Sequence, residues 1–428
     1  MKTRIRANNI EGHINMVSSK SLLHRYLILA TKSKDTKIYT NKISIDVKTT
    51  IDCLKKLGTN IEIKTFDKSN STYDQIIEVK GAKASHPKTL NMNESGASFR
   101  FLLPYTFLEQ REVEFIGKGR LPHRPIDELI NVLKESNIKF SNNRLPFKAS
   151  GKLRGSHFTF TGQTSSQYLS AIMLSAALME QVSTIQILGK MSSKNYIIMT
   201  AKCIEDFGVK VEIDESFQNI KIDGRTYKAP NEICIEGDWS NAILPIAIGL
   251  MGGEVSIGGL FKCSYQGDIN VVDILHSKGA KLIYEDDRLF AYKSDIESFD
   301  LDIDDNIDLF PVLSVLAINS KGRSIFRNIE RLKEKESNRI ESVLKLHQDI
   351  GSNAYIEDDA FVVEPSNVNP AQIDSFNDHR IVMAATLASI FTKEIIIDGF
   401  EAIEKSYPNY LEDLKLLGFE IEEILWEK

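Results

Sequence analysis

The chain has 428 residues, more than one ordinary hydrophobic core accommodates, which predicts two or three domains. Its net charge of -6 argues against a nucleic acid as the main partner, because proteins that bind DNA or RNA usually carry a basic excess. Its most apolar stretch, Ala242 to Met251, contains Pro245 and is too short to span a membrane, and Met1 to Ala7 lacks the apolar segment of a signal peptide. We therefore expect a folded cytoplasmic protein with neither a nucleic-acid nor a membrane partner.

One short pattern occurs six times along the chain: the end of an amphipathic helix, a glycine or asparagine, and then a strand of alternating polarity. The residue just after a helix often has left-handed backbone, which glycine and asparagine tolerate best. In chain order these residues are Gly58, Asn137, Gly208, Gly279, Gly351 and Gly418, roughly 70 residues apart. We predict an α/β fold of six similar units, three before about residue 236 and three after it.

Strands are predicted between the helices, where β-branched residues gather. The clearest runs are Gln75–Lys80, Glu112–Ile116, Thr184–Leu188 and Glu394–Asp398. The four cysteines, Cys53, Cys203, Cys234 and Cys263, lack the spacing of a structural zinc site or a disulfide framework. We expect reduced thiols in the core and no bound metal.

Polar clusters interrupt the repeats, and the first is Ser19–Arg25, which leads into an apolar run. Hydroxyls, backbone amides and the Lys20 ammonium at a helix start suit a phosphate or a carboxylate. The alternative is a helix cap followed by two solvated cations. Three further clusters follow at Glu94–Arg100, Arg120–Ile126 and Thr164–Tyr168 with Ser193–Tyr196, and each could bind a ligand or only cap a helix.

The second half of the chain carries its polar clusters at four places. These are Asp308, the charged run Lys333–Arg339, the segment Asn377–Arg380 and the segment Lys405–Pro408. A charged run is most often the solvated face of a helix, and that alternative stays open for Lys333–Arg339. The segment Asn377–Arg380 has four polar residues where a helix cap needs one, so it favours a functional site.

Taken in order, these clusters, together with Gln266-Gly267-Asp268, resemble the 5-enolpyruvylshikimate-3-phosphate synthases over nearly the whole chain. The resemblance implies two similar domains, each of three βαβαββ units forming an inside-out α/β barrel, with the active site in the cleft between the domains. The first domain would comprise residues 19–236 and the second residues 1–18 with 237–428. Hinge crossings would lie near residues 18–19 and 236–238.

The resemblance also implies the reaction. Enolpyruvyl would pass from phosphoenolpyruvate to the 5-hydroxyl of shikimate 3-phosphate, with release of phosphate through a tetrahedral intermediate, in the biosynthesis of chorismate and the aromatic amino acids. No cofactor is implied, and the family expectation is a monomer. Both substrates carry a phosphate and a carboxylate, so several cations must offset their desolvation and mutual repulsion.

The family's binding residues transfer to matching positions of this chain. The expected contacts of shikimate 3-phosphate are Lys20, Ser21, Arg25, Ser165, Ser166, Gln167, Ser193, Tyr196, Asp308, Arg331 and Lys335. The expected contacts of phosphoenolpyruvate are Lys20, Glu94, Gly96, Arg124, Gln167, Glu336, Arg339, Arg380 and Lys405. Two of these depart from the family pattern, because Glu94 and Arg331 each stand where asparagine is common.

For catalysis, Asp308 is the expected base for the 5-hydroxyl and Glu336 the expected acid that protonates the methylene carbon. Lys20 and Lys405 would support charge and proton movement, and His379 could orient a group or relay a proton. The family is the target of glyphosate, which occupies the phosphoenolpyruvate site, and Gly96 leaves space there. We therefore expect inhibition by glyphosate.

Two alternatives are weighed against this function. The UDP-N-acetylglucosamine enolpyruvyl transferases share fold and donor, but they usually carry a reactive cysteine in the loop that corresponds to Gly117–Arg124, which has none here. The other alternative is a catalytically silent relative that only binds small anions, and the presence of Asp308, Glu336 and the cations argues against it.

Overall fold

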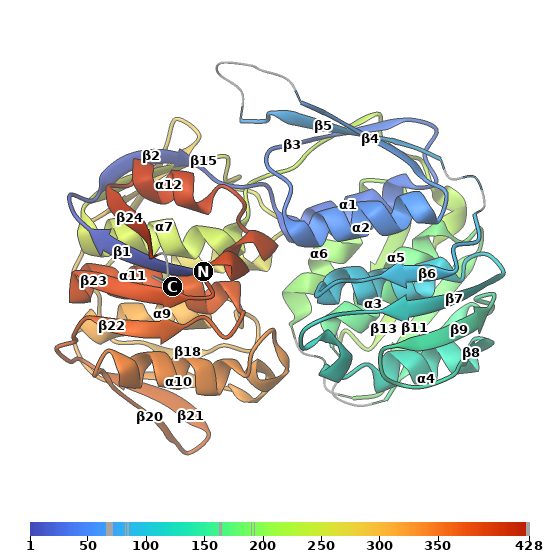
Figure 1. The fold of residues 1–428 in the computed structure, drawn as a ribbon. Helices are drawn as coiled ribbons and strands as arrows, with labels where there is room; N and C mark the ends of the chain where they lie inside the picture. Colours follow the sequence, from blue (N-terminus) through green and yellow to red (C-terminus); the bar gives the residue numbers. More distant parts are fainter. Residues whose placement is uncertain are drawn as a thin grey trace. The chain divides into compact units, whose positions relative to one another are not determined.

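The structure is a computed structural model that describes residues 1–65, 72–81, 83, 85–161, 165–189, 191 and 193–424. Its contacts divide the chain into two compact units. Unit 1 comprises Met1–Ser18 and Glu236–Lys428, and unit 2 comprises Ser19–Ile235. Figure 1 shows each unit as helices partly enclosed by strands.

Unit 2 contains three four-stranded sheets, ordered β14-β3-β5-β4, β6-β7-β9-β8 and β10-β11-β13-β12. The strands are β3 (Thr36–Thr40), β4 (Asn60–Thr65), β5 (Gln75–Lys80), β6 (Thr89–Asn91), β7 (Arg111–Ile116), β8 (Ile138–Phe140), β9 (Phe147–Gly151), β10 (His157–Phe160), β11 (Val182–Ile187), β12 (Lys210–Ile213), β13 (Asn219–Asp223) and β14 (Glu232–Cys234). The α-helices are α1 (Lys20–Ala30), α2 (Ile45–Lys56), α3 (Gly96–Thr106), α4 (Asp127–Glu135), α5 (Ser166–Leu178) and α6 (Lys194–Glu205).

Unit 1 also contains three four-stranded sheets, ordered β16-β17-β15-β2, β18-β19-β21-β20 and β22-β23-β1-β24. The strands are β1 (Lys2–Ala7), β2 (Glu11–Asn15), β15 (Glu254–Gly258), β16 (Lys281–Glu285), β17 (Arg288–Tyr292), β18 (Asp300–Asp302), β19 (Ser324–Arg327), β20 (Asn353–Glu357), β21 (Ala360–Glu364), β22 (Ala371–Asp374), β23 (Glu394–Asp398) and β24 (Phe419–Ile424). The α-helices are α7 (Trp239–Gly252), α8 (Val271–His276), α9 (Phe310–Leu316), α10 (Arg339–Asp349), α11 (His379–Thr392) and α12 (Tyr410–Leu416).

All six sheets have the same plan, which confirms the predicted repeat. In each sheet one outer strand pairs parallel with its neighbour and the other two pairings are antiparallel, as in β6-β7-β9-β8. The six residues predicted to follow helix ends all have positive φ, from 68° at Gly208 to 103° at Gly58. Each therefore reverses the chain from a helix into the antiparallel part of its sheet.

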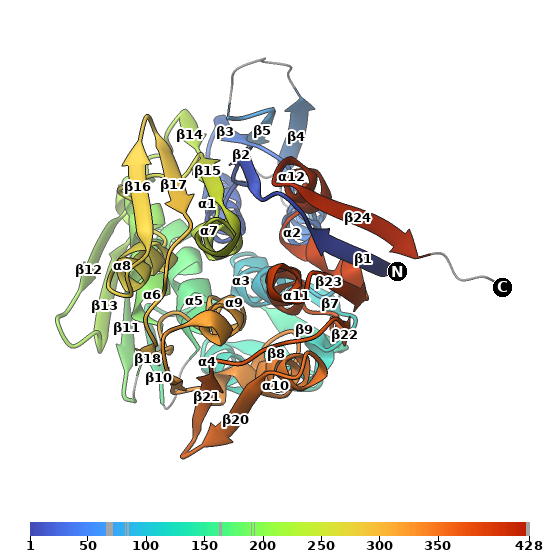
Figure 2. The ribbon, with the colours of Figure 1, turned by 90° about the vertical axis from the view of Figure 1, so that its left-hand side faces the viewer.

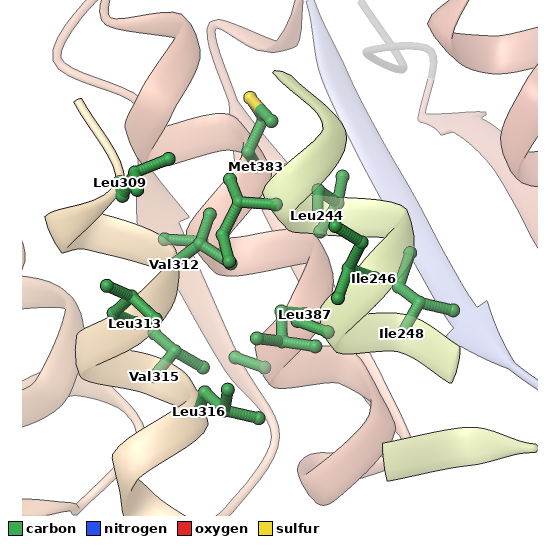
Figure 3. Packing of buried hydrophobic residues seen from close by; sticks show 14 of the residues in the cluster. Leu244, Ile246, Ile248, Leu309, Val312, Leu313, Val315, Leu316, Met383 and Leu387 are labelled. Carbon is green, nitrogen blue, oxygen red and sulfur yellow. The ribbon is translucent and has the colours of Figure 1, made fainter. Parts of the chain in front are cut away.

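Three helices form the centre of unit 1. Helices α7, α9 and α11 pack against one another, and Figure 2 shows them nearly end-on with strands around them. Figure 3 shows Leu244 of α7, Val312 of α9 and Leu387 of α11 within this core. A helix that is apolar on all sides is stable only when it is buried, which explains why the apolar run of α7 is central. Among the described residues, no helix has the length and hydropathy needed to cross a bilayer.

Two details of the sequence prediction were wrong. Strand β11 spans Val182–Ile187, so the predicted run at Thr184–Leu188 begins two residues late and ends one late. The four cysteines are free, but only Cys53 and Cys203 are buried, whereas Cys234 and Cys263 are exposed. Cys234 ends the edge strand β14, where successive side chains point to opposite faces of the sheet.

Candidate active site

The three central helices of unit 2 begin at the same end of that unit. Arg25, in the middle of α1, bonds the first half of α5 (Nη2 to Ser170 Oγ, 3.3 Å). Lys32, just after α1, bonds the last residue of α5 (Nζ to Leu178 O, 3.4 Å), so the two helices are parallel. Helix α3 joins them at the same end, where the Arg100 guanidinium lies 5.7 Å from the Tyr168 ring of α5.

Serine caps each of these three helices. Ser19, Ser95 and Ser165 accept hydrogen bonds from backbone amides of the first turns of α1, α3 and α5. In unit 1, by contrast, aspartates cap α7 and α11, namely Asp238 and Asp378. A neutral cap leaves the positive end of a helix dipole uncompensated, so this end of unit 2 favours anions.

Helix α1 carries the two cations predicted at the first cluster. Lys20 Nζ lies 3.2 Å from Asp46 Oδ2. Arg25 is buried and donates to Thr200 Oγ1 (2.8 Å), to Ser170 Oγ and to the Ser21 carbonyl (2.8 Å). Burial lowers the pKa of Arg25 to about 10. Neither cation is fully solvated, so the alternative of a cap followed by two solvated cations is wrong.

Two guanidinium groups converge on the start of α3. A methyl group on Gly96 would lie 2.6 Å from Nη1 of Arg124 and 2.7 Å from Nη1 of Arg100. Arg100 also donates to the carbonyls of Gly96 and Pro125, each at 3.2 Å. Sequence reasoning assigned no role to Arg100, although its place one helical turn after Gly96 is a signal that could have found it.

Glu94 lies against the loop that leads to Arg124. Its carboxyl carbon would be 2.7 Å from a methyl group on Gly119, a residue with a φ of +57°. A side chain at position 119 would require Glu94 to move, and this left-handed backbone favours glycine. The structure thus places Glu94 beside the loop of a predicted ligand cation.

The serine and tyrosine residues of unit 2 lie at the starts of α5 and α6. Ser165 accepts from the Gln167 amide (3.4 Å), and Ser166 is the first residue of α5. Ser193 precedes α6 in left-handed backbone with a φ of 53°, and the Tyr196 amide donates to its carbonyl (3.1 Å). Such strain in a non-glycine residue is frequent at functional sites.

The two helices are joined by a bond between side chains that sequence reasoning missed. Ser170 of α5 and Thr200 of α6 share a 2.8 Å hydrogen bond and both contact Arg25. Neither has a signal in the sequence beyond its polarity inside an apolar helix.

In unit 1, one buried arginine gathers three carboxylates. The Arg339 side chain is 1% exposed, and it bonds Asp308 Oδ1 (2.5 Å), Glu336 Oε2 (3.0 Å) and Asp378 Oδ2 (2.9 Å). Lys335 Nζ lies 3.5 Å from the same Asp308 oxygen. The alternative of a solvated charged face is therefore wrong for Lys335 and Arg339, although Lys333 is exposed and pairs with Glu330.

The charges of this cluster shift one another's titration. Burial would raise the pKa of Asp308, but Lys335, Arg339 and Arg380 hold it well below its usual range. Burial lowers the pKa of Lys335 to about 8, against the opposing effect of Asp308. Asp308 is therefore ionised at neutral pH, whereas Lys335 can gain or lose a proton at a pH close to neutral.

The predicted segment Asn377–Arg380 begins α11. Asp378 caps the helix by accepting from the Arg380 amide (2.9 Å), and its other oxygen accepts from Ser337 Oγ (3.0 Å). His379 is buried, with its Nδ1 3.8 Å from Asp378 Oδ1. Arg380 is buried, and both of its terminal nitrogens donate hydrogen bonds to Ser240, Nη1 to the carbonyl and Nη2 to the hydroxyl. Asp378 thus belongs to the carboxylate cluster around Arg339, although sequence reasoning gave this residue no role.

Two further predicted positions have defined partners in unit 1, and a third residue of the sequence motifs is buried there. Lys405 Nζ donates to the Asn377 carbonyl at 2.8 Å. Arg331 Nη1 binds Asp304 through both its carbonyl (3.1 Å) and its carboxylate (2.9 Å). Asp268, from the Gln-Gly-Asp motif, is buried, and its burial, with Asp308 nearby, raises its pKa to about 7.

The segment after Lys405 is fixed by a buried carboxyl group. Asp413 Oδ2 accepts from Tyr407 (2.7 Å) and from Asn409 (2.8 Å), and burial raises the pKa of Asp413 to about 7. Between about pH 4 and pH 7 the folded protein then binds a proton that the unfolded chain has released. The contribution of Asp413 to stability therefore falls as the pH rises through this window.

Replacing Asp413 with asparagine is expected to remove this pH dependence, because the amide keeps an oxygen acceptor but does not ionise. The free energy of unfolding of Asp413→Asn, relative to the unchanged protein, should rise by about 1–3 kcal/mol from pH 5 to pH 8. Urea unfolding at the two pH values measures it. Asp358→Asn, at an exposed turn, is the control and should follow the unchanged protein. A constant difference between Asp413→Asn and the unchanged protein would contradict the prediction.

Comparison with known proteins gives a consistent result. A family model described as EPSP synthase (3-phosphoshikimate 1-carboxyvinyltransferase) matches residues 5–414. Two relatives named 3-phosphoshikimate 1-carboxyvinyltransferase are each 32% identical: one from Clostridium perfringens, with 97% of this chain and 98% of the relative covered, and one from Brachyspira hyodysenteriae, with 98% and 100% covered.

Solved structures support the fold. An EPSP synthase from Acinetobacter baumannii has a TM-score of 0.79 at 19% identity, with 99% of this chain and 100% of that chain covered. The enolpyruvyl transferase NikO from Streptomyces tendae has a TM-score of 0.77 at 15% identity, with 98% of each chain covered. These likenesses confirm the predicted α/β fold of repeated units.

Proposed function

This chain belongs to the EPSP synthase (3-phosphoshikimate 1-carboxyvinyltransferase) family and is an enolpyruvyl transferase of aromatic amino acid biosynthesis, and from that premise we propose how its residues carry the reaction. The reaction moves the enolpyruvyl group of phosphoenolpyruvate to the 5-hydroxyl of shikimate 3-phosphate and releases phosphate. In this proposal the protein acts in the cytoplasm as a monomer and needs no cofactor.

One observation carries the proposal: two buried arginines donate hydrogen bonds to neutral oxygens, namely hydroxyls and carbonyls. Arg25 is 3% exposed and donates to two hydroxyls and a carbonyl, and Arg380 is 4% exposed and donates to the hydroxyl and carbonyl of Ser240. A buried charge is costly unless an opposite charge offsets it. Asp308 lies near Arg380, but its carboxylate also pairs with Lys335 and Arg339. Phosphate and carboxylate groups of the two substrates would supply the remaining charge, and arginine binds both of them bidentately.

We divide the binding residues between the substrates as follows. Shikimate 3-phosphate would contact Lys20, Ser21, Arg25, Ser165, Ser166, Gln167, Ser193, Tyr196, Asp308, Arg331 and Lys335. Phosphoenolpyruvate would contact Lys20, Glu94, Gly96, Arg124, Gln167, Glu336, Arg339, Arg380 and Lys405.

The proposed chemistry is addition followed by elimination. Asp308, which is ionised at neutral pH, accepts the proton of the 5-hydroxyl as its oxygen attacks C2 of phosphoenolpyruvate, and Glu336 gives a proton to the methylene carbon. In the tetrahedral intermediate, Glu336 takes a proton back from the new methyl group as the C2–O bond to phosphate breaks. The proton held by Asp308 leaves with the phosphate, so both carboxyl groups return to their starting states. Lys20 and Lys405 offset the charge on the phosphate and carboxylate of phosphoenolpyruvate. His379 orients a reacting group or relays a proton.

An acceptor assay tests the function. Phosphate release is measured with phosphoenolpyruvate and either shikimate 3-phosphate or UDP-N-acetylglucosamine. We expect turnover with shikimate 3-phosphate alone. Turnover with the nucleotide sugar alone would instead support the related enolpyruvyl transferases, and binding of both substrates without phosphate release would support a silent relative.

Gly96→Ala tests the phosphoenolpyruvate site. The new methyl group would meet the ends of Arg124 and Arg100, which are flexible, so we expect a folded protein with displaced guanidinium groups. Losing one charge-assisted contact should raise the KM for phosphoenolpyruvate and the inhibition constant for glyphosate about tenfold. The KM for shikimate 3-phosphate is the internal control and should change little. Equal inhibition of both proteins by glyphosate would count against this placement.

A further inference from the structure

The first turn of α7 contacts two distant segments of unit 1, and each segment carries a cation of the proposed site. Ser240 accepts both terminal nitrogens of Arg380, at its carbonyl and its hydroxyl. Asn241, the next residue, donates through Nδ2 to Ser406 Oγ (3.1 Å) and toward the Ser406 carbonyl (3.4 Å). Ser406 directly follows Lys405. Adjacent residues of one helix thus reach segments 140 and 165 positions away.

This turn of α7 is itself fixed. Asp238 caps it by accepting from the Asn241 amide (2.9 Å), and Gln266 accepts from the Trp239 amide (3.2 Å) while donating to the Gly237 carbonyl (2.8 Å). The Trp239 side chain is fully buried in the core of unit 1. The side chains of Ser240 and Asn241 therefore project from a backbone that has little freedom to move.

The orientation of Arg380 depends on Ser240 because the guanidinium group is planar. Two bonds from its terminal nitrogens to one residue fix the plane, as a fork grips two oxygens. Arg380 Nε is buried and has no hydrogen-bond partner among the described residues. A donor in that state favours an incoming acceptor, so the direction in which Ser240 holds the group sets where an anion can bind.

Lys405 is restrained in a comparable way. Its ammonium bonds the Asn377 carbonyl at 2.8 Å, and its backbone continues into Ser406, which is buried. Asn241 is fully buried, and its side-chain amide is bonded to the hydroxyl and the carbonyl of Ser406, so it fixes the chain directly after the lysine. A short side chain such as alanine at position 241 would leave Ser406 without these bonds.

We propose that Ser240 and Asn241 are positioning residues for phosphoenolpyruvate, Ser240 by orienting Arg380 and Asn241 by fixing the Lys405 segment. This inference rests on the proposed function, in which those two cations contact phosphoenolpyruvate. Neither residue touches the substrate in this account. Ser240 acts through Arg380, and Asn241 acts through the segment that carries Lys405. Loss of either residue therefore raises the KM for phosphoenolpyruvate and leaves the KM for shikimate 3-phosphate nearly unchanged.

Two double-mutant cycles test it. One combines Ser240→Ala with Arg380→Gln, and the other combines Asn241→Ala with Lys405→Gln, with the KM for phosphoenolpyruvate as the readout. Each α7 variant alone should raise this KM about tenfold. This is the effect expected from losing one hydrogen bond to a charged group, or to the residue next to it. In the background of its own cation variant the same change should add less than about twofold, because the group that it positions is gone.

The crossed pairs are the matched controls. In Ser240→Ala with Lys405→Gln, and in Asn241→Ala with Arg380→Gln, the two effects on KM should multiply, since each α7 residue is bonded to the segment of the other cation. Ser389→Ala removes a buried hydroxyl of α11 that bonds only within its helix (Thr386 O, 2.7 Å), and it should leave the KM unchanged. Ser240→Thr keeps the hydroxyl and should restore the KM to within about threefold.

The outcomes separate the two proposals. If Arg380→Gln and Lys405→Gln leave the KM for phosphoenolpyruvate unchanged, the proposed function of those cations fails. If they raise it but the α7 variants do not, or if all pairs multiply alike, the positioning role fails. Should Ser240→Ala not fold, the Asn241 cycle and the Ser240→Thr variant decide the matter.

Discussion

Replacing Arg339 with methionine is expected to lower the free energy of unfolding of unit 1 by about 3–5 kcal/mol. Arg339 is almost fully buried and is bonded to Asp308, Glu336 and Asp378. Methionine keeps much of the side-chain volume but removes the charge, which leaves three carboxylates close together in a site that is partly or wholly buried. Such groups must either repel one another or bind protons.

Urea unfolding at pH 7.5 measures this loss, and Lys333→Met is the matched control. Lys333 lies in the same charged run, but its pair with Glu330 is exposed, so its loss should cost less than about 1 kcal/mol. Part of the defect of Arg339→Met should disappear at pH 5, where carboxylates accept protons more readily. If the two variants were equally stable at pH 7.5, the carboxylate cluster would not depend on Arg339.

Glu336→Gln is expected to lower kcat by about 10²–10⁴-fold while the protein stays folded. Glutamine has nearly the same shape, and its oxygen can still accept from Arg339 Nη2, as Glu336 Oε2 does at 3.0 Å. It cannot pass a proton to the methylene carbon of phosphoenolpyruvate. General acid–base catalysis by a positioned side chain contributes roughly this factor.

Deuterium exchange gives a second readout of the same role. Protonation of the methylene carbon makes a methyl group, so return of the intermediate in D₂O places deuterium on phosphoenolpyruvate. Glu336→Gln should suppress this exchange as strongly as it suppresses turnover. Glu334→Gln, at an exposed position two residues earlier, is the control and should be as active as the unchanged protein. A kcat within threefold of normal for Glu336→Gln would assign the proton to another group.

The repeated fold could be predicted because its signals are local. A helix end followed by Gly58 or Asn137 specifies left-handed backbone from a few adjacent residues, and six such places gave the six sheets. Strand limits were less certain, as at β11, because tertiary pairing decides where a strand ends. The exposure of Cys234 could not be predicted, since it depends on which face of an edge strand the side chain occupies.

The candidate site was likewise predictable only in part. Cations inside compact motifs, such as Arg25 and Arg380, were identified from the sequence. Their partners were not, because Ser170 is 145 residues from Arg25 and Ser240 is 140 residues from Arg380. Hydroxyl groups inside apolar helices look like ordinary core residues until the fold brings a charge beside them.

The order of strands in the last sheet has a consequence for synthesis of the chain. Strand β1, which precedes unit 2 in the chain, lies between β23 and β24, which both follow unit 2. Unit 2 is one continuous segment, Ser19–Ile235, and all strands of its three sheets come from this segment. On the ribosome, therefore, we expect unit 2 to fold while β1 is still unpaired. The sheet β22-β23-β1-β24 can be completed only after β23 and β24 are made, so its completion should be a late and slow step of folding.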